Sequence, residues 1–464
     1  MTSTAPFDLS RPRAIHVIGA GGTGMAPITT VLAAMGHRVS GSDTKESPVI
    51  DRLRALGVDI SIGQRPENIG PDVEAVTRST AIPDANVEVV ETLRRGIPLL
   101  RRADALAGIC AQRRTIAVAG SHGKTTTSSM LALVLGEADH HPSFIVGGEL
   151  RSGGNAVWDA PAGGVSDRGW FVVEADESDG TFLELGAEVA LVTSVEPDHL
   201  EYWGGWEQLQ AGFDRFLAEA TTRIVCLDDE GAAAAGAKHG AVTYGTSEGA
   251  DYRMADVTGG RTGTSFTVAH GGEVLGEVTL PVPGIHNARN ACAALATAME
   301  IGAPFDAAAR ALARYAGVAR RFQFRGERDG VTFIDDYAHL PGEIRSMLSA
   351  AKDGGWRRIV CVFQPHRYSR MAVLPPSDFA DAFDDADVLV MTEIYAQGEA
   401  PRPGVTGKRV LDAVLDARPG RRAFWFPGRA DLAANVKSVL RPGDLCLTLG
   451  AGDLTLLPDE LLGD

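Results

Sequence analysis

Short runs of apolar, often β-branched residues alternate with helix-like stretches along almost the whole chain. Near the start, AIHVIGA is followed by a glycine turn and then by MAPITTVLAAMG, whose composition is typical of a helix. Strands of a parallel sheet are continuous apolar runs because helices cover both faces of the sheet. The alternation therefore predicts α/β domains with mostly parallel sheets.

The chain is long enough for several such domains. Its 464 residues predict three domains at about 150 residues each. We place them at residues 1–107, 108–319 and 320–464, because new series of strands and helices begin at TIAVAGSHGK and after Val318. A Gly/Thr-rich stretch over residues 240–280 has short runs of alternating residues in place of long apolar runs, which predicts a small antiparallel sheet.

Charge and cysteine content limit the possible functions. The net charge of −16 argues against extensive binding to nucleic acids or anionic membranes, because like charges repel. An anionic small-molecule ligand would need a local group of positive charges. No apolar run is long enough for a transmembrane helix, and the first residues lack the apolar core of a signal peptide. The five cysteines form no CxxC pair, which predicts buried free thiols in a cytoplasmic protein.

The first glycine motif is GAGGTG at residues 19–24, between a predicted strand and a predicted helix. Its glycines let the backbone approach a pyrophosphate, and Asp43, at the end of the next predicted strand, is placed to bind a ribose. The motif predicts a dinucleotide-like ligand such as NAD. A tight turn between strand and helix would also require glycine, without any ligand.

A second glycine loop, GSHGKTT at residues 120–126, follows the predicted strand TIAVA and opens a helix. The backbone N–H groups of such a loop, the Lys124 ammonium and the Thr125 hydroxyl suit the phosphates and Mg²⁺ of a nucleoside triphosphate. The general pattern GxxxxGK[ST] is not met, because Val118 stands at its first glycine. The loop is therefore a shorter variant of a phosphate loop.

Polar side chains follow other predicted strands of the same domain. Glu174 comes just after the apolar run WFVV, and His199 comes after VALVTSV. Ligands of open parallel sheets bind outside the carboxyl ends of the strands, so we expect Thr125, Glu174 and His199 at one edge. Isolated acids and histidines at strand ends are often only solvated, whereas two of them beside a phosphate loop favour a site.

Further polar clusters lie toward the C-terminus. Asn287 and Asn290 stand at the start of an Ala-rich helix, where they favour a capping role. Arg320-Arg321, the segment DDYAH at residues 335–339 and the segment QPHRYSR at residues 364–370 follow or flank predicted strands. Arginines in such places suit the bidentate binding of carboxylate or phosphate.

Twelve short segments stand in a fixed order: GAGGTGM, VSGSD, RSTAIP, AGSHGKTTT, VGGEL, EADESDGTFL, EPDH, PGIHNARNA, GVARRFQFRGE, IDDYAH, FQPHRYSR and LTLGAG. Together they resemble the Mur ligase family, whose members build the peptide stem of peptidoglycan. The resemblance runs from about residue 15 to 452 and points to the alanine-adding branch. The chain departs from the usual family pattern after His339, where it has Leu340-Pro341-Gly342, and after Arg370.

The resemblance implies three domains: a Rossmann-like N-terminal domain that binds a UDP-sugar, a central P-loop ATPase-like domain and a C-terminal Rossmann-like α/β domain that binds an amino acid. The implied UDP-sugar ligands are Gly21, Gly22, Ser42, Asp43, Ser79 and Thr80. The implied ATP ligands are Gly120, Ser121, His122, Gly123, Lys124, Thr125, Thr126, His286, Asn287, Asn290, Arg321 and Asp336. The implied amino-acid ligands are Tyr337, His339, His366, Arg367 and Arg370. The implied metal ligands are Thr125, Glu174 and His199, and the implied catalytic residues are Lys124, Glu174, His199 and Arg321.

The reaction that the resemblance implies is ATP-dependent joining of L-alanine to the lactyl carboxylate of UDP-N-acetylmuramate. It would pass through an acyl phosphate and use Mg²⁺ or Mn²⁺, in a cytoplasmic monomer or homodimer. A recycling ligase that attaches a preformed peptide to the same nucleotide is one alternative. A Rossmann oxidoreductase that uses NAD is another, but hydride transfer has no use for a triphosphate loop.

Overall fold

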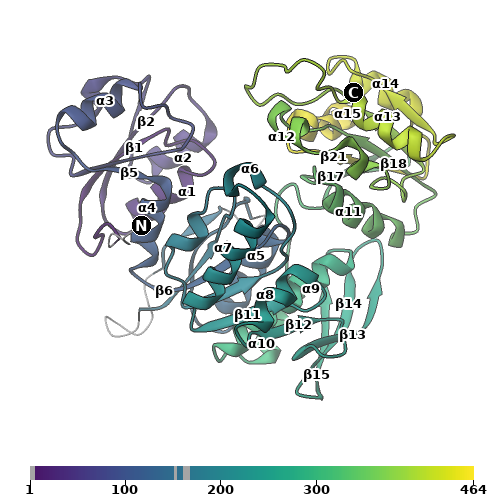
Figure 1. The fold of residues 1–464 in the computed structure, drawn as a ribbon, viewed down its shortest axis with the longest axis horizontal. Helices are drawn as coiled ribbons and strands as arrows, with labels where there is room; N and C mark the ends of the chain where they lie inside the picture. Colours follow the sequence, from purple (N-terminus) through teal and green to yellow (C-terminus); the bar gives the residue numbers. More distant parts are fainter. Residues whose placement is uncertain (1–5, 151–153, 160–167, 464) are drawn as a thin grey trace. The chain divides into compact units, whose positions relative to one another are not determined.

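The computed structural model describes residues 6–150, 154–159 and 168–463 (Figure 1). It contains three sheets with helices between their strands, in agreement with the predicted three-domain α/β architecture. The chain forms two compact units, one of residues 1–255, 267–276 and 289–312 and the other of residues 256–266, 277–288 and 313–464. The domain borders at residues 107/108 and 319/320 stay predictions.

The first sheet has the strand order β3-β2-β1-β4-β5, with parallel pairings throughout. The order reverses between β1 and β4, and ligands of such sheets bind outside the strand ends at that point. The strands are β1 (Ala14–Ile18), β2 (Arg38–Asp43), β3 (Asp59–Ile62), β4 (Ala75–Arg78) and β5 (Leu99–Arg101). The helices are α1 (Ala26–Ala34), α2 (Pro48–Ala55), α3 (Val87–Arg94) and α4 (Arg102–Cys110).

The second sheet has the order β15-β14-β13-β12-β11-β10-β6-β9-β7-β8. Its central strands β6, β9 and β10 are parallel, and their apolar residues are buried because both faces of the sheet are covered. The strands are β6 (Arg114–Ala119), β7 (Ser143–Ile145), β8 (Ala156–Val157), β9 (Trp170–Glu174), β10 (Val189–Val192), β11 (Thr222–Cys226), β12 (Val242–Gly245), β13 (Tyr252–Gly259), β14 (Thr264–His270) and β15 (Glu273–Leu280). The helices are α5 (Lys124–Glu137), α6 (Leu200–Trp203), α7 (Trp206–Glu219), α8 (Glu230–Ala237), α9 (Ile285–Glu300) and α10 (Phe305–Leu312).

The Gly/Thr-rich stretch forms β12 to β15 at one end of this second sheet. The prediction of a small antiparallel sheet is wrong for β12, which pairs in parallel with both β11 and β13. Helix α8 connects β11 to β12, and such a helical crossover returns the chain in the same direction.

The third sheet has the order β16-β17-β21-β18-β19-β20, parallel except for the β16–β17 pair. Both faces are covered, since Val360 and Val362 of β18 join one apolar cluster and Cys361 and Phe363 join the other. The strands are β16 (Gln323–Arg328), β17 (Val331–Asp336), β18 (Arg358–Phe363), β19 (Val388–Met391), β20 (Ala423–Trp425) and β21 (Asp444–Leu449). The helices are α11 (Pro341–Asp353), α12 (Tyr368–Val373), α13 (Lys408–Ala417), α14 (Leu432–Val439) and α15 (Leu457–Gly463).

The cysteine prediction is confirmed, because all five thiols are free and buried. Among the described residues, no helix combines the length and the apolar content that a membrane span needs.

Candidate active site

The phosphate loop joins β6 to α5, as predicted, and two of its glycines are sterically required. Gly120 and Gly123 have φ of +132° and +81°, which few other residues adopt. A Cβ atom on Gly120 would collide with the Thr193 hydroxyl, and one on Gly123 would lie 2.5 Å from Asn290 Oδ1. The loop therefore passes close to the end of β10 and to α9.

Two residues of the loop are anchored to the segment after β10. The Ser121 N–H donates to the Ser194 carbonyl at 3.0 Å, and the His122 N–H donates to the Ser194 hydroxyl at 3.0 Å. The His122 ring lies 3.2 Å from Glu196 Oε2. Thr125 and Thr126 are buried in the first turn of α5. The start of this helix therefore supplies the N–H groups that remain for a phosphate.

Lys124 lies in an acidic pocket at this helix start. Its Nζ donates to the Gly120 carbonyl at 2.5 Å and lies 2.9 Å and 3.0 Å from the two Glu177 carboxylate oxygens. Burial acts to lower the pKa of Lys124, but the charges of Glu177, Asp176 and Glu174 outweigh it and raise this pKa above its usual range. Burial raises the pKa of Glu177. The ammonium is therefore firmly charged and held beside the loop.

Glu174 is the last residue of β9 and His199 follows β10, and both of these strands pair with β6. Glu174 Oε2 accepts the Gly147 N–H at 2.7 Å. The His199 ring lies 3.3 Å from Asp198 and 4.0 Å from Glu201. No group of three or more His, Cys, Asp or Glu side chains that could hold a metal occurs in the described part of the chain. The metal ligands Thr125, Glu174 and His199 stay a prediction.

The donor set near the loop nevertheless fits a magnesium nucleotide. Mg²⁺ prefers oxygen ligands and is commonly held by one or two carboxylates together with substrate phosphates. Glu174 is in register with Val118 of β6, so its carboxylate and the Thr125 hydroxyl belong to adjacent elements at one sheet edge. His199 offers a nitrogen, which suits Mg²⁺ less well.

The two asparagines near the start of α9 make different contacts. The Asn287 amide nitrogen donates to the Pro283 carbonyl at 2.7 Å and so contacts the turn before the helix. The expected capping bond is a different one, in which a side-chain oxygen accepts a backbone N–H of the first turn. Asn290, one turn later, faces Gly123 of the phosphate loop. The ring of His286 packs close to Gly284 at the same turn.

The glycine loop of the first sheet is held together by Asp43. The Gly21 N–H donates to Asp43 Oδ2 at 2.9 Å, and the Thr44 N–H donates to Oδ1 at 2.7 Å. Both carboxylate oxygens thus have partners within the loop region. The buried Ser42 hydroxyl donates to Glu88, whereas Gly22, Ser79 and Thr80 lie after β1 and β4 at the reversal point.

Four of the predicted amino-acid ligands come together in the segments that follow β17 and β18 of the third sheet. The Tyr337 and His339 rings lie 5.4 Å apart, and the His339 and His366 rings lie 5.5 Å apart, both edge to face. Arg370 Nη1 contacts His339 Nε2. Burial, followed by the charges of His339, Arg370 and Arg367, lowers the pKa of His366 to about 3. His366 is therefore neutral at physiological pH.

Asp336 and Arg321 border this cluster. Asp336 accepts the N–H groups of Phe322 at 2.6 Å and Ala338 at 2.7 Å, and burial raises its pKa to about 6. The Arg321 guanidinium lies 5.4 Å from the Tyr337 ring centre. Arg367 is exposed, and its Nε donates to Gln397 Oε1 at 2.6 Å.

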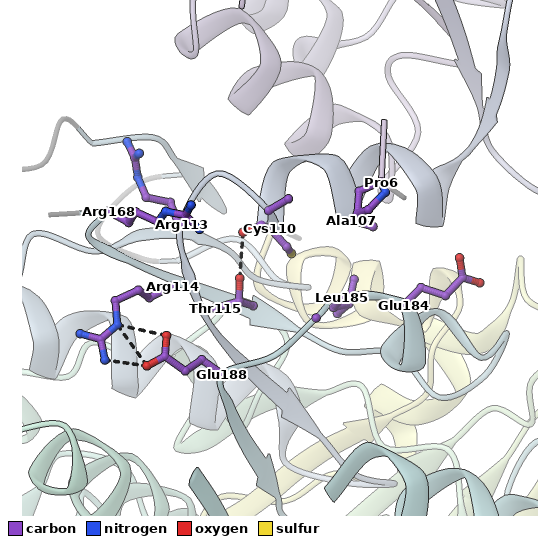
Figure 2. Close-up of a pocket in the computed structure, with 12 residues that line it drawn as sticks. Pro6, Ala107, Cys110, Arg113, Arg114, Thr115, Arg168, Glu184, Leu185 and Glu188 are labelled. Carbon is purple, nitrogen blue, oxygen red and sulfur yellow. Dashed lines mark hydrogen bonds and ion pairs between the residues drawn. The ribbon is translucent and has the colours of Figure 1, made fainter. Parts of the chain in front are cut away.

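Two cavities accompany these sites. One, of about 470 Å³, lies in the third domain and includes Gln364, Tyr395 and Gln397 in its lining. Figure 2 shows the other, of about 350 Å³, near the start of β6, where Arg114 is paired with Glu188 at 2.6 Å. This second cavity lies at the opposite end of β6 from the phosphate loop.

Sequence reasoning missed four partners of these residues. Glu177 pairs with Lys124, and it belongs to the acid-rich segment EADESD that also supplies Glu174. Glu343 accepts the His339 N–H at 2.9 Å. Gln397 and Glu399 contact Arg367 and Ser369 from a loop 30 residues away, and no local pattern marks them.

Comparison with known proteins identifies related domains along nearly the whole chain. Three family models match in chain order: "Mur ligase family, catalytic domain" at residues 14–114, "Mur ligase middle domain" at 118–298 and "Mur ligase, glutamate ligase domain" at 320–452. The chain belongs to the Mur ligase family. The family assignment made from the twelve segments is thereby confirmed.

Two curated relatives of this Mur ligase are both named UDP-N-acetylmuramate–L-alanine ligase. The one from Desulforamulus reducens is 43% identical over 97% of this chain and 98% of its own. The one from Anaeromyxobacter sp. is 42% identical over 98% of both chains. Among solved structures, the UDP-N-acetylmuramate–alanine ligase MurC of Thermotoga maritima has a TM-score of 0.80 and 28% identity over 97% of this chain and 98% of that chain.

Proposed function

We propose that this Mur ligase joins L-alanine to the lactyl carboxylate of UDP-N-acetylmuramate with cleavage of ATP to ADP and phosphate, a step in peptidoglycan precursor synthesis. Relatives at 42–43% identity over nearly the whole chain carry the name of that enzyme. The structural observation that carries the proposal is the cluster of His339, His366 and Arg370 with nearby Arg367, in a chain that also has a phosphate loop.

The first step activates the carboxylate, since hydroxide is too poor a leaving group for direct attack by an amine. A carboxylate oxygen attacks the γ-phosphorus of ATP, the bond from the γ-phosphorus to the bridging oxygen breaks, and ADP leaves. Lys124 at the phosphate loop and Arg321 would stabilise the charge on the transferred phosphoryl group. Bound Mg²⁺, held by Thr125 and Glu174 with His199 toward a second ion, would neutralise phosphate charge.

The second step forms the amide. The alanine amine attacks the acyl carbon, the C–N bond forms, inorganic phosphate leaves and the nitrogen loses a proton. Arg367 and Arg370 would bind the alanine carboxylate through their guanidinium groups. His366 is buried and neutral, and with Tyr337 it would limit the space beside the methyl group.

The glycine loop after β1 would bind the UDP part of the substrate rather than NAD. In dinucleotide-binding folds, the acid after β2 binds a ribose hydroxyl. Here the Asp43 carboxylate accepts N–H groups from Gly21 and Thr44, so it stabilises the loop itself. This arrangement disfavours the oxidoreductase alternative. We further propose a cytoplasmic monomer or homodimer that binds neither nucleic acid nor membrane.

The test is ADP release by the purified protein with ATP, Mg²⁺ and UDP-N-acetylmuramate, with single amino acids added one at a time. We expect release with alanine and little with acidic amino acids. A parallel reaction contains a preformed stem tripeptide in place of alanine. Faster release with the tripeptide would favour the recycling ligase and contradict the proposal.

A further inference from the structure

The loop after β19 runs alongside the turn that carries the predicted amino-acid ligands. Its Tyr395 pairs with His366 as an isolated parallel bridge. The Arg367 N–H donates to the Tyr395 carbonyl, and the Tyr395 N–H donates to the Pro365 carbonyl, both at 2.9 Å. The Tyr395 and His366 rings stack with centres 6.0 Å apart and planes 8° apart. This loop therefore fixes the backbone of the turn.

Gln397 in this loop contacts the turn through its side chain. Its Oε1 accepts Arg367 Nε at 2.6 Å, and its amide also lies beside the His366 ring. Arg367 and Gln397 have φ of +61° and +47°, a region that non-glycine residues rarely adopt. Such backbone conformations persist only where the surroundings enforce them, and they concentrate at functional sites.

The hydrogen bond determines which edge of the Arg367 guanidinium is available. With Nε engaged by Gln397, the Nη1 and Nη2 atoms make no hydrogen bond or ion pair with any residue that the structure describes. Two parallel N–H donors are the geometry that binds a carboxylate bidentately. Because Gln397 is neutral, it orients the guanidinium without cancelling its charge.

We infer that Gln397 is a positioning residue for amino-acid recognition: it holds Arg367 so that the Nη1–Nη2 edge faces the carboxylate of the incoming amino acid. This inference rests on the proposed function, because it takes Arg367 as a ligand of that carboxylate. Gln397 also lines the cavity of about 470 Å³ beside the turn.

The test compares steady-state kinetics of the wild type, Gln397→Ala, Gln397→Glu, Arg367→Ala and the double variant Arg367→Ala/Gln397→Ala. We expect Gln397→Ala to raise the KM for alanine about 10- to 100-fold, as for loss of a hydrogen bond to a charged group. The KM values for ATP and UDP-N-acetylmuramate should not change. Gln397→Glu keeps an acceptor for Nε but adds an opposing charge, so it too should raise the KM for alanine.

The double variant separates the inference from the proposed function. If Gln397 acts through Arg367, the double variant is no worse than Arg367→Ala alone. Fully additive effects, or an unchanged KM in Gln397→Ala when Arg367→Ala raises it, would overturn the inference and leave the site intact. An unchanged KM in Arg367→Ala would overturn both. Arg409→Ala, at an exposed position of α13, is the matched surface control.

Discussion

Replacing Lys124 by alanine tests both the chemistry and the stability of the phosphate loop. The Lys124 side chain is 14% exposed and its Glu177 partner 2% exposed, and the charged atoms lie 2.9 Å apart. The substitution removes the cation that, in the proposed mechanism, stabilises the transferred phosphoryl group. It also leaves a buried carboxylate without its partner.

Both effects have a predictable size. Loss of a charge-assisted contact in a transition state lowers turnover by about 100- to 1000-fold. Removal of one member of a buried ion pair costs about 3–5 kcal/mol of folding free energy. For a domain of this size, that loss corresponds to a fall in melting temperature of about 6 to 20 °C. The double variant Lys124→Ala/Glu177→Gln removes both charges, so most of the stability should return while activity stays absent.

The assays are ADP release with saturating substrates and thermal melting of each purified variant at pH 7. Near-normal ADP release by Lys124→Ala would refute the phosphate-loop assignment. A double variant that melts as low as Lys124→Ala would refute the ion-pair reasoning. Glu177→Gln alone is the matched control, because it keeps the lysine and loses only the opposing charge.

Four further predictions concern the other domains and the substrate. In calorimetry without ATP, UDP-N-acetylmuramate should bind saturably, and binding of NADH that the UDP-sugar cannot displace would contradict this. The kcat/KM for glycine and for serine should be about 10- to 200-fold lower than that for alanine, because each differs from alanine by one small group. Glutamate should not be used at all. Competition between these amino acids in one reaction measures the ratios. Buried Glu88 accepts hydrogen bonds from Ser42 Oγ, Asn68 Nδ2 and the Arg65 N–H. Glu88→Ala should therefore destabilise the first domain by about 1–3 kcal/mol for each donor that loses its acceptor, as measured by urea unfolding. Burial raises the pKa of Asp336 to about 6, so the folded state favours the protonated carboxyl group. As pH rises from 4 to 6, the free energy of unfolding should therefore fall by about 3 kcal/mol. Asp336→Asn should abolish this pH dependence when unfolding is measured across the same range.

The sequence was most informative where backbone geometry restricts the residue type. Gly120 and Gly123 were predictable as parts of a phosphate loop, and the structure shows that a Cβ atom would be obstructed at both positions. Apolar runs such as IVCVF predicted buried parallel strands, because both faces of those strands are covered. These features depend on neighbours in the sequence or on a fixed period.

Contacts between distant segments were not predictable in the same way. The pattern of strand ends predicted Thr125, Glu174 and His199 at one sheet edge, but it did not predict that the carboxylate paired with Lys124 is Glu177, three residues after Glu174. Gln397 lies 30 residues after Arg367, in a loop without a motif. The strand order brings such segments together, and the side-chain rotamers determine which residues then contact each other. Neither composition nor periodicity of the sequence predicts these contacts.

The two adjacent arginines after Val318 illustrate what the structure adds. Arg320 Nη2 donates to the Gly450 carbonyl at 2.6 Å, so Arg320 holds the loop after β21. Arg320 and Phe322 have φ of +59° and +44°, and the Phe322 N–H donates to Asp336. The backbone is thus clamped on both sides of Arg321. Two left-handed residues therefore restrict the backbone at Arg321, and the Arg321 guanidinium lies 5.4 Å from the Tyr337 ring centre. A backbone fixed in this way needs no further ordering when the guanidinium binds a phosphoryl group, which favours the role proposed for Arg321.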